Sequence, residues 1–453
     1  MSKIPVILIF DVGKTNKKLF LFNQQYKVVY EEIIEFKETV DEDDFPCENL
    51  ELLSEWVKSS YQKWINSSEF EIKAVNFSTY GASFVLIDEN GKSVFPLYNY
   101  LKPINQDLLD SFYEKYGGEQ KFAVETASPI LASLNAGLQL YRLKQEKGED
   151  FRKVKYALHL PQYLSYLLTN KVASEMTSIG CHTGLWNFQN DKYHEWVDHE
   201  NISEKLPSIE PCNKIISVDE GNVLVGNGIH DSSAALIPYL KSIQDHFLLI
   251  STGTWCISLN PFNDFSLTKD ELEKDCLFYF SYQGKPVKAS RLFAGNEHEL
   301  NIKKLSDYFH VDIEQFKSIR FDHELIKELQ SIENNIDGDF NPHESIFSKR
   351  KLDQFKNIEL AYHQLMLDIV NMQVESTKLV LKHTDVKNIY VDGGFSNNDL
   401  YLRLLALKFN DYNVYSAEVA QASALGAAIA IHDSWNPIPL KASLININQV
   451  HLI

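Results

Sequence analysis

The sequence predicts an α/β protein with two domains, and three observations support this prediction. The chain has 453 residues, 44% hydrophobic and 23% charged, which is a globular composition with enough length for two large domains. Two apolar runs joined by a short polar turn containing glycine occur at residues 4–23 and again at 247–260, the pattern of a β-hairpin. Residues 388–431 fit the order strand, glycine-rich turn, helix, strand and helix, which is α/β connectivity.

The first half alternates between strand and helix patterns. Residues 50–65 carry Leu53, Trp56, Val57, Tyr61 and Trp64 at helical spacing. In order, we expect a hairpin at 4–23, a helix at 50–65, a strand at 72–77, a second hairpin at 84–97, helices at 132–144 and 161–168, a strand at 215–225 and a helix from 232.

The second half begins with the hairpin at 247–260. The elements expected after it are helices with loops at 322–357, a long amphipathic helix at 358–382, a strand at 388–391, a helix at 399–409, a strand at 414–416 and a helix of small residues at 423–431. Because a glycine-tipped hairpin opens each half, we expect a domain boundary near residues 232–246 and domains at 1–238 and 239–453.

Charge and cysteine usage exclude several classes of protein. The formal net charge is −18, which disfavours non-specific binding to nucleic acid or to anionic lipid. The five cysteines stand singly and form no CxxC pair, which favours a reducing compartment over disulfides or a zinc site. The apolar run before Asp11 is too short for a signal peptide or a membrane span. We therefore expect a soluble cytoplasmic protein that binds neither nucleic acid nor membranes.

The tip of the first hairpin, DVGKTNKK at residues 11–18, has the composition of an anion-binding turn. A glycine lets backbone N–H groups approach an anion, the polar and basic residues add donors and positive charge, and Asp11 at the end of a strand suits a hydrated Mg²⁺. The candidate anion-binding residues are Gly13, Lys14, Thr15, Asn16, Lys17 and Lys18. On the hairpin alone, a plain β-turn with exposed lysines is the stronger interpretation. The turn is not a Walker A loop, because Leu8 stands where that motif needs glycine.

Two further glycine turns suit a nucleotide. In the second hairpin, Gly253 and Thr254 offer backbone and hydroxyl groups to phosphate oxygens. After a later strand, Gly393 and Gly394, followed by Asn397, permit a nucleotide to approach closely. Taken singly, an ordinary hairpin and a helix-entry turn explain these segments equally well or better.

Asp231 is the strongest single candidate for chemistry. It follows Gly228 and His230 and precedes a helical run, so it is either a helix N-cap or a general base aimed at a substrate hydroxyl. His230 would be its hydrogen-bonding partner or a buried core histidine. Arg291 would either contact an anionic or polyol ligand or pair with an acid.

The order of these motifs resembles the FGGY carbohydrate kinases, which belong to the actin-like (ribonuclease H-like) ATPase superfamily. The similar segments are the first hairpin, Tyr80-Gly81, the GxHD motif that ends at Asp231, STGTW at 251–255 and the late strand ending in GGF-S-N. The resemblance covers nearly the whole chain. It implies two actin-like α/β domains with a cleft between them that closes on Mg-ATP and a ketose.

The resemblance also implies roles for individual residues. Asp231 matches the catalytic base and Asp11 the acid that supports the metal. Residues 13–18 match the first phosphate hairpin, Gly253 and Thr254 the second, and Gly393, Gly394 and Asn397 the adenosine side. The sugar-binding positions are Gly81, Ala82, His230, Asp231, Ser232 and Arg291. One departure affects the sugar: the family usually has TWGVD where this chain has Thr79-Tyr80-Gly81-Ala82-Ser83, so a charged hydroxyl acceptor is lost.

The expected function is ATP-dependent phosphorylation of a primary hydroxyl of a ketose. Residues 81–88 and 158–168 look most like rhamnulokinases and slightly less like L-fuculokinases, so L-rhamnulose is the first candidate and L-fuculose or another ketose or polyol the alternative. A non-catalytic sugar sensor or an assembly ATPase on the same fold is the alternative from another class. The expected partners are ATP, Mg²⁺ and the sugar, with a monomer and a homodimer both left open. The phosphotransferase hypothesis requires both glycine tips to hold one polyphosphate.

Overall fold

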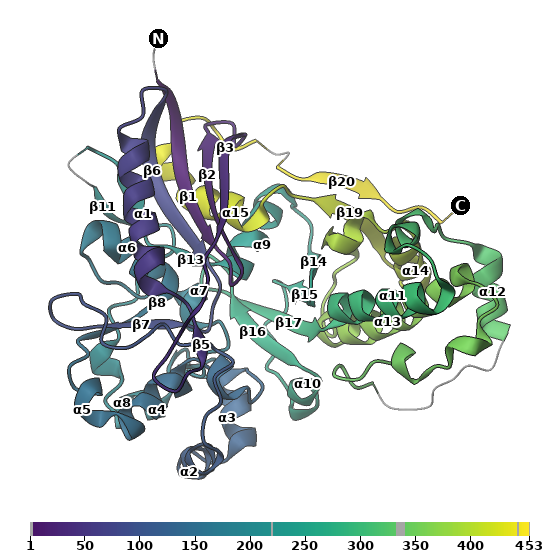
Figure 1. The fold of residues 1–453 in the computed structure, drawn as a ribbon, viewed down its shortest axis with the longest axis horizontal. Coiled ribbons are helices and arrows are strands. Elements are labelled where there is room, and N and C mark those ends of the chain that lie inside the picture. Colours follow the sequence, from purple (N-terminus) through teal and green to yellow (C-terminus); the bar gives the residue numbers. More distant parts are fainter. Residues whose placement is uncertain (1–2, 219–220, 332–339, 442–443, 453) are drawn as a thin grey trace. The chain divides into compact units, whose positions relative to one another are not determined.

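The computed structural model describes residues 3–218, 221–331, 340–441 and 444–452 (Figure 1). Contacts divide the chain into two compact units that are interleaved in sequence. Unit 1 comprises Met1–Ser242, Phe278–Pro286 and Ala420–Leu444, and unit 2 comprises Ile243–Leu277, Val287–Val419 and Ile445–Ile453. Within the described residues, no helix combines the length and the apolar character needed to cross a membrane.

Unit 1 is built on a mixed sheet with the strand order β11-β12-β6-β1-β2-β3, and β13 also pairs with β6. β1, β2 and β3 form an antiparallel meander, whereas β6 runs parallel to β1 and both β12 and β13 run parallel to β6. The bounds are β1 Ile4–Val12, β2 Asn16–Asn23, β3 Val28–Glu35, β6 Phe70–Thr79, β11 Ile215–Val218, β12 Leu224–Gly226 and β13 Ile229–His230. The predicted first hairpin and the strand at 72–77 are confirmed. The segment 215–225 instead forms two antiparallel strands, β11 and β12.

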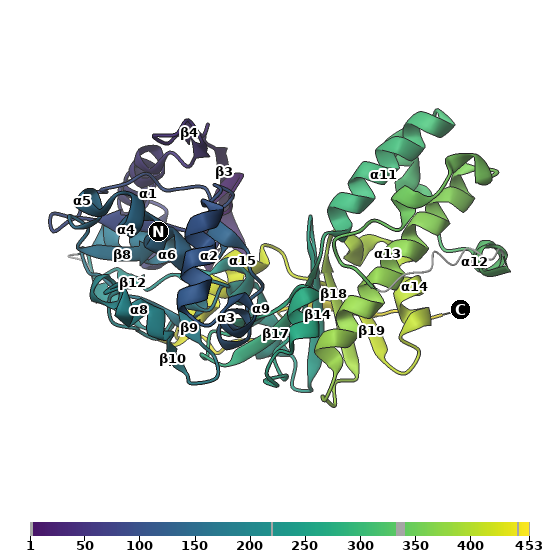
Figure 2. The ribbon, with the colours of Figure 1, turned by 90° about the horizontal axis from the view of Figure 1, so that it is seen from below.

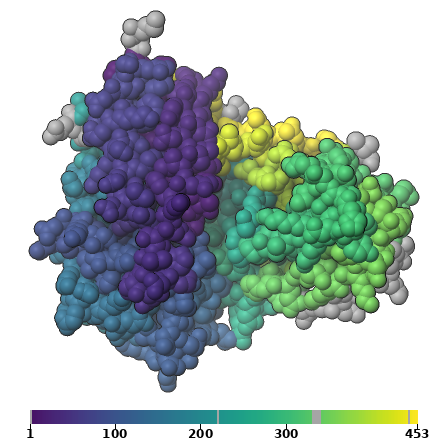
Figure 3. All heavy atoms as spheres, in the orientation of Figure 1, coloured from purple at the N-terminus to yellow at the C-terminus, as the bar shows by residue number. Residues whose placement is uncertain are grey.

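Alternation along β1 assigns its side chains to two faces of the sheet. Val6, Leu8, Phe10 and Val12 join the apolar core cluster that contains residues of helices α1 (Leu50–Ile65) and α6 (Leu160–Thr169). Asp11 must therefore face the other way, toward the helices α9 (Asp231–Ser242) and α15 (Ala422–Ala430), which contact β1 and β6. β3 is the edge strand, with alternate residues exposed, and it lies within the purple surface of Figure 3.

The helices α9 and α15 approach each other closely because their contact is made by small residues. A Cβ added to Gly426 would lie 1.8 Å from the carbonyl oxygen of Ala234, so only glycine permits this spacing. The contact joins the last predicted helix of the chain to the helix that begins with Asp231. The chain thereby returns to unit 1 and brings Gln421 and Ser423 to the end of β1.

A second layer of unit 1 packs around Phe112, Phe122 and Trp196. Its helices and strands are α2 Gln106–Lys115, α3 Glu119–Thr126, α4 Gly137–Glu146, α5 Gly148–Phe151, α8 Glu195–His199, β7 Phe84–Ile87 and β8 Tyr156–His159. The remaining elements of unit 1 are α7 Met176–Ile179 and the short pairs β4 Thr39–Val40 with β5 Pro46–Cys47 and β9 Trp186–Asn187 with β10 Lys192–Tyr193. The hairpin predicted at 84–97 forms in part, because the Val94 N–H donates to the Leu86 carbonyl at 2.8 Å and the Asp88 N–H to the Lys92 carbonyl at 2.9 Å. An isolated bridge also joins Ile87 to Ser93, but β7 pairs as a strand with β8, which the sequence did not indicate.

Unit 2 contains a sheet in which β17, β15, β14, β18, β19 and β20 are neighbours in that order. β14, β18 and β19 are parallel, and the predicted hairpin of β14 and β15 is confirmed. The bounds are β14 Phe247–Thr252, β15 Cys256–Asn260, β16 Cys276–Phe280, β17 Pro286–Leu292, β18 Asn388–Gly393, β19 Asn413–Glu418 and β20 Asn446–Gln449.

The helices of unit 2 include the long α13 (Ile358–Leu381), most of whose side chains are buried. It contacts α11, α14 and β15, and Figure 2 shows α11 and α13 running through this unit. The other helices are α10 Lys269–Glu273, α11 Ala294–Phe309, α12 His323–Ser331, α14 Asp399–Lys408 and α16 His432–Trp435, the last of which belongs to unit 1. The predicted helices at 358–382 and 399–409 are confirmed.

Candidate active site

Three parallel strands of unit 1 end side by side and bring the candidate residues together. Asp11 on β1 pairs in register with Ser78 on β6, and Ile229 on β13 pairs with the same Ser78. Gly81 follows β6, and Asp231 follows β13 as the first residue of α9. The carboxyl ends of parallel strands are the usual ligand-binding edge of an α/β sheet.

Asp11 is held by side chains from two other elements. The Ser423 hydroxyl of α15 donates to its Oδ2 at 2.9 Å, and Lys18, its partner across the hairpin, donates from Nζ to Gln421 Oε1 at 3.2 Å. Burial and the negative charge of Asp231 together raise the pKa of Asp11 to about 6, against the opposing effects of Ser423 and Lys18. An oxygen-donor site with two neighbouring carboxylates is chemically suited to a hard cation such as Mg²⁺.

We expect Asp11→Asn to stabilise unit 1 in a pH-dependent way. Because the folded pKa of Asp11 exceeds the unfolded value of 3.8, ionising Asp11 costs folding free energy, and that cost grows as pH rises from the unfolded pKa to the folded pKa of about 6 and is constant above it. The amide variant avoids the cost. In buffer without nucleotide or Mg²⁺, its Tm should exceed that of the wild type more at about pH 7.5 than at about pH 5. An equal Tm difference at both pH values would show that Asp11 does not titrate in this range.

Asp231 has one occupied carboxylate oxygen. Its Oδ1 accepts from the Ser232 backbone N–H at 2.6 Å and from the Ser232 hydroxyl at 3.2 Å, and it lies 3.1 Å from His230 Nε2. Within the described part of the chain, no hydrogen bond to its Oδ2 is recorded. The side chain is 35% exposed, so Oδ2 is accessible to a ligand.

The sugar-site segment predicted at Gly81 and Ala82 adjoins His230. A Cβ on Gly81 would lie 3.1 Å from His230 Nε2 and 2.4 Å from Cys181 Sγ, so the absence of a side chain permits this contact. Ala82 has a left-handed backbone with φ of 56°, and its carbonyl accepts from Gln139 Nε2 at 3.0 Å. Gly81, Ala82, His230, Asp231 and Ser232 thus belong to one region of unit 1.

The three lysine side chains at the tip of the first hairpin point to different places. Lys17 is buried, and its ammonium contacts Glu48 at 2.9 Å and the Lys14 carbonyl at 3.0 Å. Lys14 pairs with Glu38 at 2.7 Å near the surface. Lys18 alone lies on the side of Asp11, as strand alternation requires. At the turn itself, the Gly13 N–H donates to the Asn16 carbonyl at 2.9 Å, and Thr15 and Asn16 are exposed.

In unit 2 the second tip and the glycine pair are tightly packed backbone. Gly393 has φ of 84°, and a Cβ there would lie 1.9 Å from the Thr252 carbonyl oxygen. The Thr252 hydroxyl donates to the Asp392 carbonyl at 2.5 Å and accepts from the Phe395 N–H at 2.9 Å. A Cβ on Gly295, near the start of α11, would lie 1.8 Å from the Gly253 carbonyl oxygen. The second tip is therefore surrounded closely by backbone atoms, because glycine at 295 and 393 lets neighbouring segments approach it.

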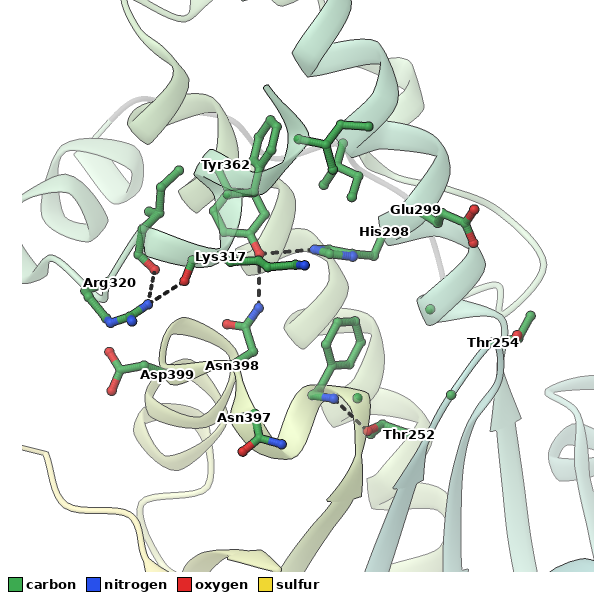
Figure 4. Close-up of a pocket in the computed structure, with 18 residues that line it drawn as sticks. Thr252, Thr254, His298, Glu299, Lys317, Arg320, Tyr362, Asn397, Asn398 and Asp399 are labelled. Carbon is green, nitrogen blue, oxygen red and sulfur yellow. Dashed lines mark hydrogen bonds between the residues drawn. The ribbon is translucent and has the colours of Figure 1, made fainter. Parts of the chain in front are cut away.

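A cavity of about 540 Å³ opens beside this tip (Figure 4). Four residues predicted from the sequence line it: Gly253, Thr254, Gly394 and Asn397. Gly393 is not a lining residue itself, but it precedes Gly394, which is. The lining residues that the sequence did not indicate include Gly295, His298, Phe316, Lys317, Arg320, Tyr362 and Asn398.

The interior of the cavity carries a neutral polar network. Asn398 Nδ2 donates to the Tyr362 hydroxyl oxygen at 3.0 Å, which leaves the Tyr362 hydrogen for His298 Nε2 at 3.1 Å, as Figure 4 shows. Burial lowers the pKa of His298 to about 4, so this imidazole is neutral at pH 7. Apolar walls with a few fixed polar groups are typical of a site for a small organic ligand.

Arg291 is engaged within unit 2. Its Nη2 donates to Asp275 Oδ1 at 2.7 Å and its Nε to Asp275 Oδ2 at 3.1 Å, and its guanidinium lies 5.4 Å from the centre of the Trp255 ring. Of the two sequence interpretations of Arg291, this geometry agrees with pairing to an acid. Its role toward a sugar stays a prediction.

Solved structures with the same fold include several sugar kinases. A carbohydrate kinase from Novosphingobium aromaticivorans superimposes with a TM-score of 0.81 at 18% identity, covering 99% of this chain and 94% of that one. Plasmodium falciparum glycerol kinase with ADP gives a TM-score of 0.73 at 15% identity, covering 95% and 90%. The fold is therefore that of the two-domain kinases of the actin-like ATPase class, and the predicted fold class is confirmed.

Sequence comparison narrows the class to a family. The N-terminal domain model of the FGGY family of carbohydrate kinases matches residues 6–234, and the FGGY C-terminal domain model matches residues 244–438. The chain belongs to the FGGY family of carbohydrate kinases, as its motifs predicted.

Individual relatives are distant. A rhamnulokinase of Halalkalibacterium halodurans is 25% identical over 270 residues, which are 55% of each chain. An L-fuculokinase of Escherichia coli K12 is 21% identical over 273 residues, 56% of each chain. The matched region thus spans about half the length of these curated relatives.

Proposed function

We propose that this chain is an ATP-dependent sugar kinase that phosphorylates a primary hydroxyl of a ketose, with L-rhamnulose as the first candidate. The observation that carries the proposal is the open carboxylate oxygen of Asp231, placed beside Asp11 where three parallel strands end. The similarity to rhamnulokinases supports the choice of sugar, with L-fuculose or another ketose as the alternative.

Asp231 would act as the general base. With Oδ1 occupied by Ser232 and His230, the carboxylate is fixed in orientation and Oδ2 is left to accept the proton of the attacking hydroxyl. Phosphoryl transfer depends mainly on positioning and on charge stabilisation, so a fixed base next to the reacting hydroxyl is an appropriate contribution. Gly81 and Ala82, next to His230, would supply backbone contacts to the sugar.

Asp11 and Lys18 would bind the charged end of the nucleotide. Mg²⁺, when bound, would neutralise charge on the phosphates, and Asp11 is the described carboxylate best suited to hold it or its water ligands. Lys18 on the same face would contribute positive charge, together with the backbone and polar groups of residues 13–16. Because Lys17 is paired with Glu48, we leave it out of this phosphate site.

The cavity of unit 2 would bind the nucleoside. Its apolar wall, its neutral His298–Tyr362–Asn398 network and its volume suit a purine base and ribose. Gly253 and Thr254 would meet the phosphates at its edge, and Gly394 with Asn397 would lie along the adenosine.

A coupled ADP-release assay across a sugar panel tests the proposal. With Mg-ATP we expect release to depend on sugar and to be fastest with L-rhamnulose among L-rhamnulose, L-fuculose, D-xylulose, L-ribulose and glycerol. A different best ketose would correct the substrate and retain the kinase. ADP release that is independent of sugar would favour an assembly ATPase, and nucleotide binding without release would favour a sensor.

A further inference from the structure

A chain of polar side chains leads away from Asp231 into unit 1. Cys181 Sγ lies 3.2 Å from His230 Nε2 and 3.5 Å from His182 Nε2. Cys181 and His182 follow α7, and both they and His230 are buried. At its far end, His182 Nδ1 lies 2.9 Å from the Leu134 carbonyl oxygen. One continuous series of polar contacts therefore runs from Asp231 through His230, Cys181 and His182 to the carbonyl of Leu134.

The positions of the protons follow from the partners. A carbonyl oxygen only accepts, so His182 Nδ1 carries the hydrogen, and Nε2 of a neutral His182 must accept, from the Cys181 thiol. With the thiol hydrogen given to His182, Cys181 Sγ accepts from His230 Nε2, and this nitrogen also lies 3.1 Å from Asp231 Oδ1, so its hydrogen is shared between the two acceptors. At the other side of the ring, the Ser233 hydroxyl gives its hydrogen to the Phe280 carbonyl at 2.7 Å and lies 3.5 Å from His230 Nδ1. Ser233 therefore accepts from His230 Nδ1, and both nitrogens of His230 carry hydrogen.

The electrostatic surroundings of His230 agree with this assignment. Burial disfavours the charged imidazole, but Cys181 and Asp231, both within hydrogen-bonding distance of His230 Nε2, outweigh burial and raise the pKa of His230 well above its usual range. Of the other titratable groups nearby, Glu175 at the start of α7 also interacts favourably with His230, whereas His159 at the end of β8 opposes its charge.

We propose that Cys181 and His182 are positioning residues that keep His230 doubly protonated and oriented, so that His230 holds Oδ1 of Asp231 and leaves Oδ2 open as the proton acceptor. This inference rests on the proposed kinase function, in which Asp231 is the base. Gly81 is part of the arrangement, because a side chain there would meet Cys181 Sγ and displace it. The sugar-binding segment and the series of contacts therefore adjoin at Gly81.

Substitution of Cys181 tests the proposal kinetically. With the panel sugar that gives the fastest ADP release, Cys181→Ala should lower kcat by roughly 10- to 100-fold, the range seen when a metal-ligating histidine loses its outer hydrogen-bonding partner, with a smaller change in KM. Cys181→Ser keeps a donor and an acceptor and should recover most of kcat. Cys212→Ala is the matched control, because Cys212 is a buried thiol of the same unit that instead donates to the Tyr282 carbonyl. It should retain wild-type kcat.

Nitrogen NMR of histidine side chains in the ligand-free protein tests the proposal without turnover. At neutral pH, His230 should show both nitrogens protonated, and Cys181→Ala or His182→Gln should convert it to a neutral ring while Cys181→Ser does not. A singly protonated His230 in the wild type, or unchanged His230 signals in Cys181→Ala, would overturn the inference. If these signals change as expected but Asp231→Asn keeps wild-type kcat, the role of Asp231 fails while the protonation of His230 stands.

Discussion

Asp231→Asn should bind Mg-ATP and the ketose with affinities near those of the wild type and yet lose roughly 10²- to 10⁴-fold in kcat, the contribution expected of a general base. The amide preserves the size of the side chain, and its Oδ1 still accepts from Ser232, so the start of α9 should keep its geometry. What the variant lacks is an anionic Oδ2 that accepts the proton of the sugar hydroxyl. Initial rates and calorimetric binding measure the two quantities separately.

The matched control is Asp110→Asn, which changes an exposed aspartate on α2 of the same unit and should leave kcat unchanged. Wild-type kcat in Asp231→Asn would remove Asp231 from the mechanism. A loss of ATP affinity as large as the loss of kcat would instead assign it to nucleotide binding.

Glu48→Ala should be one of the most destabilising single substitutions in unit 1. Lys17 and Glu48 are only 1% and 3% exposed, and removing the acid leaves the Lys17 ammonium buried without its counter-charge. Such a loss typically costs about 3–5 kcal/mol of unfolding free energy. Because Lys17 also donates to the Lys14 carbonyl, the first tip should loosen as well. Urea unfolding measures the cost.

Two comparisons isolate burial as the cause. Glu38→Ala breaks the more exposed pair with Lys14, at 45% and 24% exposure, and should change stability by no more than about 1 kcal/mol. The double variant Lys17→Met with Glu48→Leu removes both charges and should be more stable than Glu48→Ala alone. Equal costs for Glu38→Ala and Glu48→Ala would contradict the structural role of the buried pair.

Local signals in the sequence predicted most of the fold. The hairpins of β1 with β2 and of β14 with β15 were predictable because turn and strands are contiguous. The pairing of β7 with β8 was not, because β8 lies about 70 residues later and the nearby DENG turn pointed to the segment 94–97 as the partner strand. Non-local strand pairing depends on packing that no local pattern encodes.

The candidate site also contains some residues that the sequence indicated and others that it could not indicate. Asp11, Asp231 and the glycine tips stand at strand ends, so their order in the sequence was informative. Strand alternation could also have separated Lys17 from Lys18, since neighbours on a strand face opposite sides. Tyr362, Arg320 and Asn398 could not be predicted, because they come from separate helices and loops without a motif. Cys181 could not be predicted either, because its meaning depends on contacts with His182 and His230.

Phosphorus NMR of the reaction mixture tests the central claim most directly, because it follows the γ-phosphoryl group itself. With Mg-ATP and L-rhamnulose, the γ-phosphate signal should be replaced by a phosphomonoester signal that is split by the two protons of an adjacent methylene group, as expected for a primary hydroxyl. Asp231→Asn should form this product much more slowly. Conversion of the γ-phosphate to inorganic phosphate alone, with every sugar of the panel, would contradict the assignment of this chain as a sugar kinase.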